Sequence, residues 1–497
     1  MTDVASSANV VLKASRWAVL SMPVQIAKAI ILFGSQIVLA RLLSPSDFGI
    51  VAMCAPIFSF LYIINDLGLS QATIQRPELT KQDSSLIFWI NVGFGLVISA
   101  VIVLIAPSVG RFYGDDRVST VFSAMAGLVL IGSLSSQQVA LMFRGMKQVP
   151  LLLIDIAPVV VGAVSSISAA VMGAGYWAIV IGQGGHALTA ASMAWIMSGF
   201  RPAWPRWTSN LRPLCRFGLH MTGLSLASFL STNLSLVLVG RIFGVVQVGL
   251  FDRGNKLVVM SYTQVLTPLT GISQTLLARL LADEARYRRA FLQMIEAMLL
   301  VVMPGLACLA IMSDAAVDLL YGSKWMECSP LVFWFALGSL MTPIGVGASW
   351  LFVTQGRTAK MLKFGLISNA LSVLSLLLGL LGGVVGVAIS FAIFSIPSTC
   401  LTVWGATREG PVSLADFVKM LLPILTAVTA AALSVYAGSV MLEPLHHSSI
   451  VQLFLGVVVA YSATALALGS FRSGRRVLRD AARIRFMFRS QQEVPAV

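Results

Sequence analysis

The chain has 497 residues, of which 57% are hydrophobic and only 11% are charged. A typical soluble domain is about 25% charged, so this composition excludes an ordinary soluble enzyme, a secreted disulfide scaffold and a disordered chain. The five cysteines are scattered without a CxxC pair, which predicts neither a zinc site nor a disulfide framework. The hydrophobic residues form long runs rather than a strict alternation, so we predict an all-α polytopic membrane protein and not a β-barrel.

Fourteen runs are long enough to cross a bilayer, which takes about 20 mostly apolar residues per helix. The first run is too long for a signal-peptide core and is predicted to be retained. Joining the spans on either side of the tight turn at Gly173–Tyr176 or at Gly382–Gly383 would give thirteen spans instead. The predicted spans are 17–40, 48–70, 85–107, 119–142, 151–173, 175–198, 217–240, 248–275, 290–312, 330–354, 364–382, 384–404, 420–441 and 450–470.

The basic residues test this count. The chain carries 34 Lys and Arg against 20 Asp and Glu, a net charge of +14. If the N-terminus is cytoplasmic, 26 of these basic residues fall on cytoplasmic segments, six on the opposite face or in the helical turns next to it, and two deeper within spans, as the positive-inside rule requires. We therefore predict fourteen spans with both termini cytoplasmic. The positive charge is then a topology signal, and no nucleic-acid partner is expected.

A shift of 200 residues aligns landmarks in the two halves of the chain. Arg41 and Gly49 fall on Arg241 and Gly249, and each Arg–Gly pair brackets the loop before the next span. Parallel repeats of this kind are a transporter architecture with the substrate site between the halves. We predict two pseudo-symmetric six-helix lobes, two further helices and a basic cytoplasmic tail, at residues 1–200, 201–405, 406–470 and 471–497.

Polar residues follow one face of several spans. In the first and seventh spans they recur at helical intervals and in the same register under the 200-residue shift. These stripes predict a hydrophilic cavity, although hydroxyl groups also join helices to one another in membranes. The polar residues predicted to line the cavity are Gln25, Ser35, Ser225, Ser228, Thr232, Ser235 and Thr263.

Three cations lie inside predicted spans, namely Lys28, Arg253 and Lys256. A cation at the bilayer midplane costs roughly 2.5–3.5 kcal/mol on insertion scales, so we predict that these three face water or bind an anionic substrate. The alternatives are a structural ion pair, for Lys28 with an acid such as Asp66, and an interfacial anchor for the other two. Arg41 and Arg241 lie at the mouths, where they are candidates for a gate or for headgroup contacts.

Four further titratable residues are candidates for ion coupling, and helix capping or packing is the alternative for each; they are Asp66, Asp155, Glu296 and His186. The chain has no Walker A motif, no HExxH and no GxSxG. The predicted external loops are too short to build a catalytic centre. We therefore predict no catalytic residue, no metal and no cofactor, and a transporter rather than an enzyme.

Four motifs resemble one known family. They are ARLLSPSDFG at 40–49, DLGLSQATIQR at 66–76, FWIN at 88–91 and GLFDRGNKL at 249–257. Together they resemble the polysaccharide transporter (Wzx-type flippase) family of the multidrug/oligosaccharidyl-lipid/polysaccharide (MOP) exporter superfamily, in the branch of the colanic acid and succinoglycan exporters. The likeness extends over about residues 10–410.

This resemblance implies a V-shaped pair of six-helix lobes with two helices appended, in the bacterial cytoplasmic membrane. It implies alternating-access transport of undecaprenyl-diphosphate-linked oligosaccharides for exopolysaccharide or lipopolysaccharide assembly, alongside a polysaccharide polymerase and a chain-length regulator. By motif position Lys28, Arg253 and Lys256 would line a cationic cavity. The alternatives are a multidrug exporter of the same superfamily, an integral-membrane glycan polymerase or ligase, and a scaffold for envelope assembly.

Overall fold

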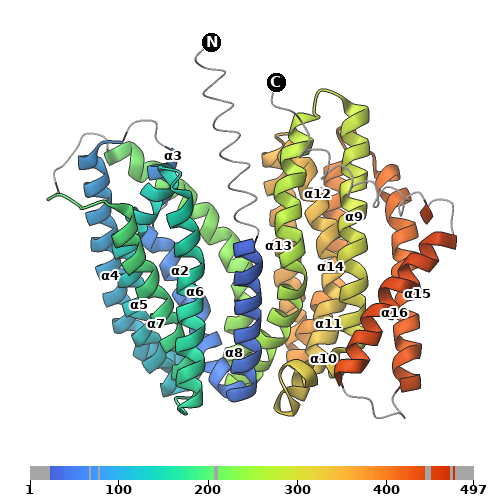
Figure 1. Ribbon diagram of the computed structural model, residues 1–497, viewed down its shortest axis with the longest axis horizontal. Coiled ribbons are helices and arrows are strands. Elements are labelled where there is room, and N and C mark those ends of the chain that lie inside the picture. The colour runs from blue at the N-terminus through green and yellow to red at the C-terminus, as the bar shows by residue number, and fades with distance from the viewer. Residues whose placement is uncertain are drawn as a thin grey trace. The chain divides into compact units, whose positions relative to one another are not determined.

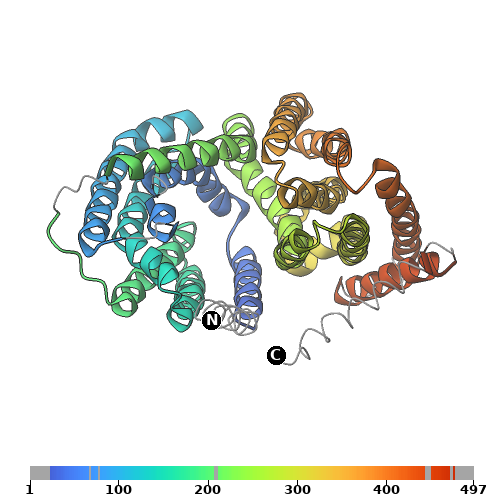
Figure 2. The same ribbon diagram turned by 90° about the horizontal axis from the view of Figure 1, so that it is seen from above.

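The computed structural model describes residues 23–66, 69–75, 79–205, 211–442, 449–470 and 474–475, with side chains for all of these except 63–66, 71–72, 75, 211–232 and 442. The described part of the chain is helical and contains no strand. The chain divides into two compact units, Met1–Gly249 and Leu250–Val497. In each unit the helices stand side by side (Figure 1) and are seen nearly end-on from above (Figure 2).

Among its described residues the first unit contains seven helices and the beginning of an eighth. They are a first helix at Pro23–Leu42, α2 at Pro45–Asp66, α3 at Leu69–Gln75, α4 at Lys81–Tyr113, α5 at Asp116–Arg144, α6 at Gln148–Val171, α7 at Trp177–Ser198, and α8, which starts at Leu211. Within this unit α4 packs on α5, and α6 packs on α7.

The second unit begins inside α8, which ends at Arg279. The helices that follow are α9 at Glu284–Ile311, α10 at Ser313–Leu320, the 3-10 helix η1 at Ser323–Cys328, α11 at Ser329–Ser339, α12 at Thr342–Thr354, α13 at Thr358–Leu380, α14 at Gly383–Thr407, α15 at Leu414–Leu442 and α16 at Ser449–Ser470. Both α15 and α16 pack against α9. The boundary between the units lies at 249/250, whereas the predicted lobe boundary lies at 200/201.

All fourteen predicted spans coincide with helical segments among the described residues, the first from Pro23 onwards. Length and composition identify twelve candidate spans there, and two features account for the difference. The α7 helix, which contains the polar stretch Gly182–His186, is not among the twelve. Asn233–Arg279 covers the predicted span 248–275 but only the end of the span 217–240, most of which lies outside the described side chains. The tight turns at Gly173–Tyr176 and Gly382–Gly383 both separate two helices, as the fourteen-span prediction requires.

Local chemistry sets several helix ends. Thr80 and Asp83 form a capping box at the start of α4, because each side chain accepts a hydrogen bond from the other's backbone N–H. Asp115 caps α5 by accepting from the backbone N–H of Arg117. The side-chain hydrogen bond from Arg117 also holds the pKa of Asp115 below its ordinary value. Gly244, with φ 82° and ψ −177°, breaks α8 between the two predicted crossings that it joins.

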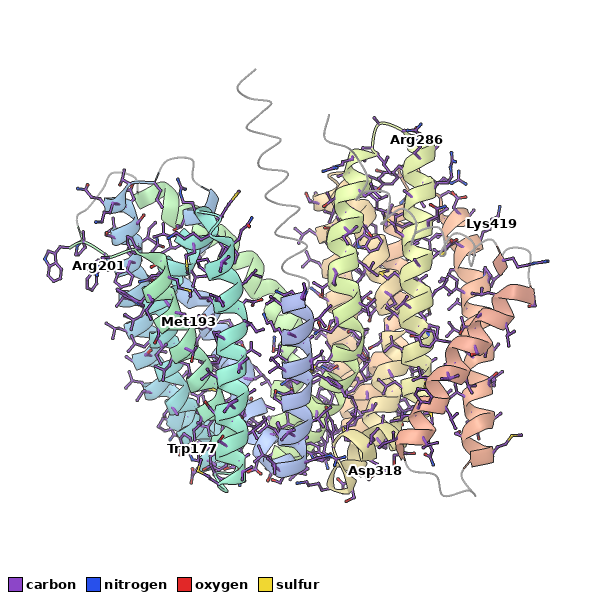
Figure 3. The ribbon with its side chains drawn as sticks, in the orientation of Figure 1. Trp177, Met193, Arg201, Arg286, Asp318 and Lys419 are labelled. Carbon is purple, nitrogen blue, oxygen red and sulfur yellow. The ribbon has the colours of Figure 1, made fainter. Side chains whose placement is uncertain are left out.

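The ends of the helices alternate as the predicted topology requires. In the first unit Trp177, at the start of the predicted span 175–198, and Arg201, in the loop after its end, lie toward opposite ends of the bundle (Figure 3). In the second unit Arg286 and Lys419 lie at one end, and Asp318 lies at the other (Figure 3). The positions of these five residues agree with their places along the predicted spans and loops.

Candidate substrate site

The cation of the first helix is bound by an acid of α6. The ammonium of Lys28 forms an ion pair with Oδ1 of Asp155. The amide of Gln25 donates to Oδ2 of the same carboxylate at 2.6 Å. Gln25 and Lys28 are three residues apart and so share one face of the first helix, which turns that face toward α6.

This ion pair changes the interpretation of Lys28. The sequence predicts that Lys28 binds substrate or pairs with an acid such as Asp66, but in the structure its partner is Asp155, and the Asp66 side chain lies outside the described side chains. The pair is only partly covered, because the side chains of Lys28 and Asp155 are 28% and 32% exposed. An exposed pair exchanges partners more readily than a buried one, so an anion can compete for this ammonium.

His186 adds a third titratable group near the pair. The α6 and α7 helices approach closely through small residues, and a Cβ atom at Gly162 would lie 3.1 Å from Cβ of His186. The His186 side chain is exposed and lies close enough to Lys28 and Asp155 for their charges to act on it. Groups from the first helix, α6 and α7 therefore form one cluster, which we call the Lys28 cluster: Gln25, Lys28, Asp155 and His186.

A second cluster lies on α8 in the second unit and is centred on Asp252. Nη2 of Arg253 donates to Oδ2 of Asp252 at 2.7 Å, and Nζ of Lys256 donates to the same oxygen at 2.9 Å. The Asp252 and Arg253 side chains are each 6% exposed, whereas that of Lys256 is 49% exposed. Of the two predicted cations in this Asp252 cluster, only Lys256 is open to an incoming ligand.

Packing against η1 and α11 explains why Arg253 is buried. A Cβ atom at Gly254 would lie 3.0 Å from Sγ of Cys328, and that thiol donates to the carbonyl of Leu250 at 3.3 Å. Buried Tyr321 lies in electrostatic range of Arg253. The sequence predicts Arg253 as a ligand of the substrate, but its position suits it to hold Asp252 in place.

Asp252 is absent from the predicted site residues, although a local signal identifies it. It precedes Arg253 directly and lies four residues before Lys256, the spacing of an intrahelical ion pair. No such local signal links Lys28 to Asp155, because 127 residues separate them. Only the tertiary packing of the first helix against α6 brings these two together.

The remaining predicted residues with described side chains lie in several other parts of the fold. Ser35 and Thr263 donate to carbonyls of their own helices, at 3.0 Å to Leu32 and 2.9 Å to Val259. Arg41 and Arg241 are exposed, and the Arg241 guanidinium lies 5.6 Å from the centre of the Phe112 ring. Ser235 and Glu296 are partly buried, and three side chains fall outside the described ones: Ser225, Ser228 and Thr232.

The chain is similar to proteins of bacterial polysaccharide synthesis. Residues 38–330 match the family described as "Polysaccharide biosynthesis protein". The chain is 22% identical to the lipopolysaccharide biosynthesis protein WzxC of Escherichia coli (strain K12), over 73% of this chain and 75% of WzxC. It is 23% identical to the succinoglycan biosynthesis transport protein ExoT of Rhizobium meliloti (73% and 76%) and 24% identical to the teichuronic acid biosynthesis protein TuaB of Bacillus subtilis (81% and 84%).

Two solved structures share the fold. The lipid II flippase MurJ, in an inward closed conformation, matches with a TM-score of 0.70 at 13% identity, over 90% of this chain and 98% of MurJ. An inward-facing multidrug resistance MATE transporter of the MOP superfamily matches with a TM-score of 0.59 at 14% identity, over 77% and 94%. Since the family match covers more than half of the residues, the chain belongs to the polysaccharide biosynthesis protein family and has the all-α fold of the MOP superfamily transporters.

Proposed function

We propose that this protein is a flippase that carries lipid-linked oligosaccharides across the bacterial cytoplasmic membrane for the assembly of surface or exported polysaccharide. The observation that carries the proposal is family membership combined with the fold of a lipid II flippase. One sequence relative is named as a transport protein, which favours transport over catalysis. Both termini are cytoplasmic in this proposal, because that orientation puts most basic residues on the inner face.

The proposed substrate is an oligosaccharide on undecaprenyl diphosphate. A diphosphate is a dense anion, and ammonium groups in a low-dielectric site bind such groups strongly. Lys28 in the first unit and Lys256 in the second are each proposed as a ligand of such an anion, because the Lys28 side chain is partly exposed and the Lys256 side chain is exposed. Arg253 acts as a positioning residue that fixes Asp252 and through it Lys256. The polar groups of the first and seventh spans are proposed to contact the glycan.

Transport is proposed to follow alternating access with ion coupling. Asp155 is the main candidate for the coupling group, because it already binds the cation that the substrate would take. His186 lies beside that pair, and Asp66 and Glu296 are further candidates. We also propose that a polysaccharide polymerase and a chain-length regulator act with the protein.

A drug exporter is the second candidate, since a multidrug transporter shares the fold. The sequence relatives instead carry names from polysaccharide biosynthesis. The two functions differ in substrate charge, because a diphosphate lipid is anionic, whereas the drugs expected for such an exporter are cationic. Purified protein should therefore bind undecaprenyl diphosphate, and cationic drugs should not compete with it.

The test is export of polysaccharide in cells that depend on this protein. Lys28→Ala and Lys256→Ala should each abolish surface polysaccharide while the amount of membrane-inserted protein stays normal. Lys360→Ala is the matched control, because Lys360 is an exposed lysine near the start of α13 that pairs with Glu409 and belongs to neither cluster. Normal export by both cluster variants would overturn the cationic site, and absence of undecaprenyl diphosphate binding to the unmodified protein would overturn the substrate class.

A further inference from the structure

The start of α2 crosses residues 245–249 of α8 at unusually close range, within the first unit. A Cβ atom at Gly49 would overlap the carbonyl oxygen of Val245 and lie 2.8 Å from its carbonyl carbon. A Cβ atom at Gly249 would overlap the carbonyl oxygen of Pro45 and lie 3.0 Å from the backbone nitrogen of Gly49. Only the hydrogens of a glycine Cα fit at these two points, an arrangement typical of Cα–H···O contacts.

This crossing is reciprocal under the 200-residue shift. Pro45 opens α2 after the short break at Leu43–Ser44, and Val245 follows the break at Gly244 inside α8. Gly49 and Gly249 each lie four residues further on, one helical turn in. Each glycine contacts the carbonyl of the other repeat's opening residue, which is the pattern of a self-complementary contact about a two-fold axis. The two repeats therefore meet here through equivalent backbone atoms.

Further contacts extend the crossing toward the preceding helix ends. A Cβ atom at Gly240 would lie 3.2 Å from Cγ of Met53 and 3.1 Å from Cε1 of Tyr113. Met53 is 1% exposed and Tyr113 is buried, and the next residue, Arg241, covers the ring of Phe112. Tyr113 and Arg241 belong to loops predicted on the external face, and Met53 and Gly240 lie in the adjoining ends of predicted spans. These contacts extend the tight packing around the glycine pair at that end of the first unit.

We propose that the Gly49–Gly249 crossing is the closed external gate of the transporter, which parts when the substrate is released. This proposal rests on the proposed flippase function, because an alternating-access cycle must open the external end. The contacts named above are suited to a gate. They are van der Waals and Cα–H···O contacts, so their separation leaves no charge and no strong hydrogen-bond donor newly unpaired. A symmetric contact between two equivalent helices also opens evenly from both sides.

The first test places a reporter under the gate. In a chain whose native cysteines are replaced by alanine, Met53→Cys should react slowly with a membrane-impermeant maleimide added outside intact cells. Adding Gly49→Ala or Gly249→Ala should raise that rate at least fivefold, because a methyl group forces the backbones apart. Gly34→Ala is the matched control, since a Cβ atom there meets nothing within 4 Å. Equal rates in the gate and control variants would overturn the proposal.

The second test does not require an alanine variant to fold. Met53→Cys and Gly240→Cys, introduced together, should form a disulfide on oxidation and stop polysaccharide export, and a reductant should restore it. Undiminished export by the fully cross-linked protein would overturn the gate. Maleimide labelling reports opening without any substrate, so it separates the two proposals. Reporter rates that rise as expected in a protein that does not bind undecaprenyl diphosphate would leave the gate standing and refute the proposed substrate.

Discussion

The ion pair between Lys28 and Asp155 can be measured by a double-mutant cycle. The variants are Lys28→Met, Asp155→Asn and the two together, each compared with the unmodified chain by its free energy of unfolding in detergent. If the pair stabilises the contact between the first helix and α6, each single variant loses the whole interaction. The double variant should then be little less stable than either single variant.

The expected size follows from the exposure of the two side chains. Unit charges about 4 Å apart attract by about 4 kcal/mol at an effective dielectric constant of 20, before any desolvation cost. Fully exposed pairs retain roughly 0–1 kcal/mol, and loss of one partner of a buried pair costs roughly 3–5 kcal/mol. Since Lys28 and Asp155 are 28% and 32% exposed, we expect a coupling free energy of about 1–2 kcal/mol.

The matched control is the pair of Lys360 and Glu409, whose side chains are 45% and 55% exposed. The same cycle there, with Lys360→Met and Glu409→Gln, should give a much smaller coupling free energy, because solvent screens an exposed pair. A coupling free energy for Lys28 and Asp155 no larger than that of the control would refute the reasoning. It would mean that this ion pair does not hold the first helix to the unit.

Three further predictions follow. Asp252→Asn should cost about 3–5 kcal/mol of unfolding free energy, because it removes a buried carboxylate bound by two cations. Asp283→Asn, at a helix cap 47% exposed, should cost less than about 1 kcal/mol, because asparagine caps a helix as well as aspartate and only an exposed ion pair is lost. Equal losses would contradict the burial argument. Gly386→Ala should destabilise the protein by about 1–3 kcal/mol, because its Cβ would lie 2.5 Å from the carbonyl oxygen of Gly379 on α13. Gly365→Ala, with open space around it, should instead stabilise the protein by up to about 1 kcal/mol. Melting temperatures of the two variants that shift in the same direction would refute this. The hydrogen bond from Lys360 lowers the pKa of Glu409 from 4.5. The stability added by that pair is therefore present above pH 4.5 and is lost as the pH falls through the lowered pKa. The difference in unfolding midpoint between the unmodified chain and Glu409→Gln should shrink over that range, and a difference that grows would contradict the prediction.

Most of the helical layout can be predicted from the sequence because a bilayer sets both the length and the polarity of a crossing segment. The boundaries are less accurate where polar residues extend a helix beyond its apolar run. The α4 helix begins at Lys81, four residues before the predicted span, because Thr80 and Asp83 cap it there. The α7 helix shows the opposite difficulty, since its glycines and His186 make it polar for a crossing helix although its length fits one.

The candidate site is only partly readable from the sequence. Cations within apolar runs stand out because their burial is costly, so Lys28, Arg253 and Lys256 are identified directly. The partners that neutralise them depend on packing. The Lys28–Asp155 pair forms because the first helix lies against α6, and periodicity within one helix does not encode that contact. The burial of Arg253 likewise depends on η1 and α11, which lie about 70 residues further along the chain.

The ion pairs in the two clusters have an electrical consequence. The Lys28 cluster is neutral when His186 is uncharged, and the Asp252 cluster carries one positive charge. A membrane potential of 100 mV shifts the energy of a unit charge that crosses the whole membrane by about 2.3 kcal/mol. With so little net charge in the two clusters, voltage acts weakly on them in the empty carrier, whereas it acts strongly on a carrier loaded with a multiply charged anion. A potential that is negative inside would therefore drive the loaded, outward step and leave the empty return almost unopposed.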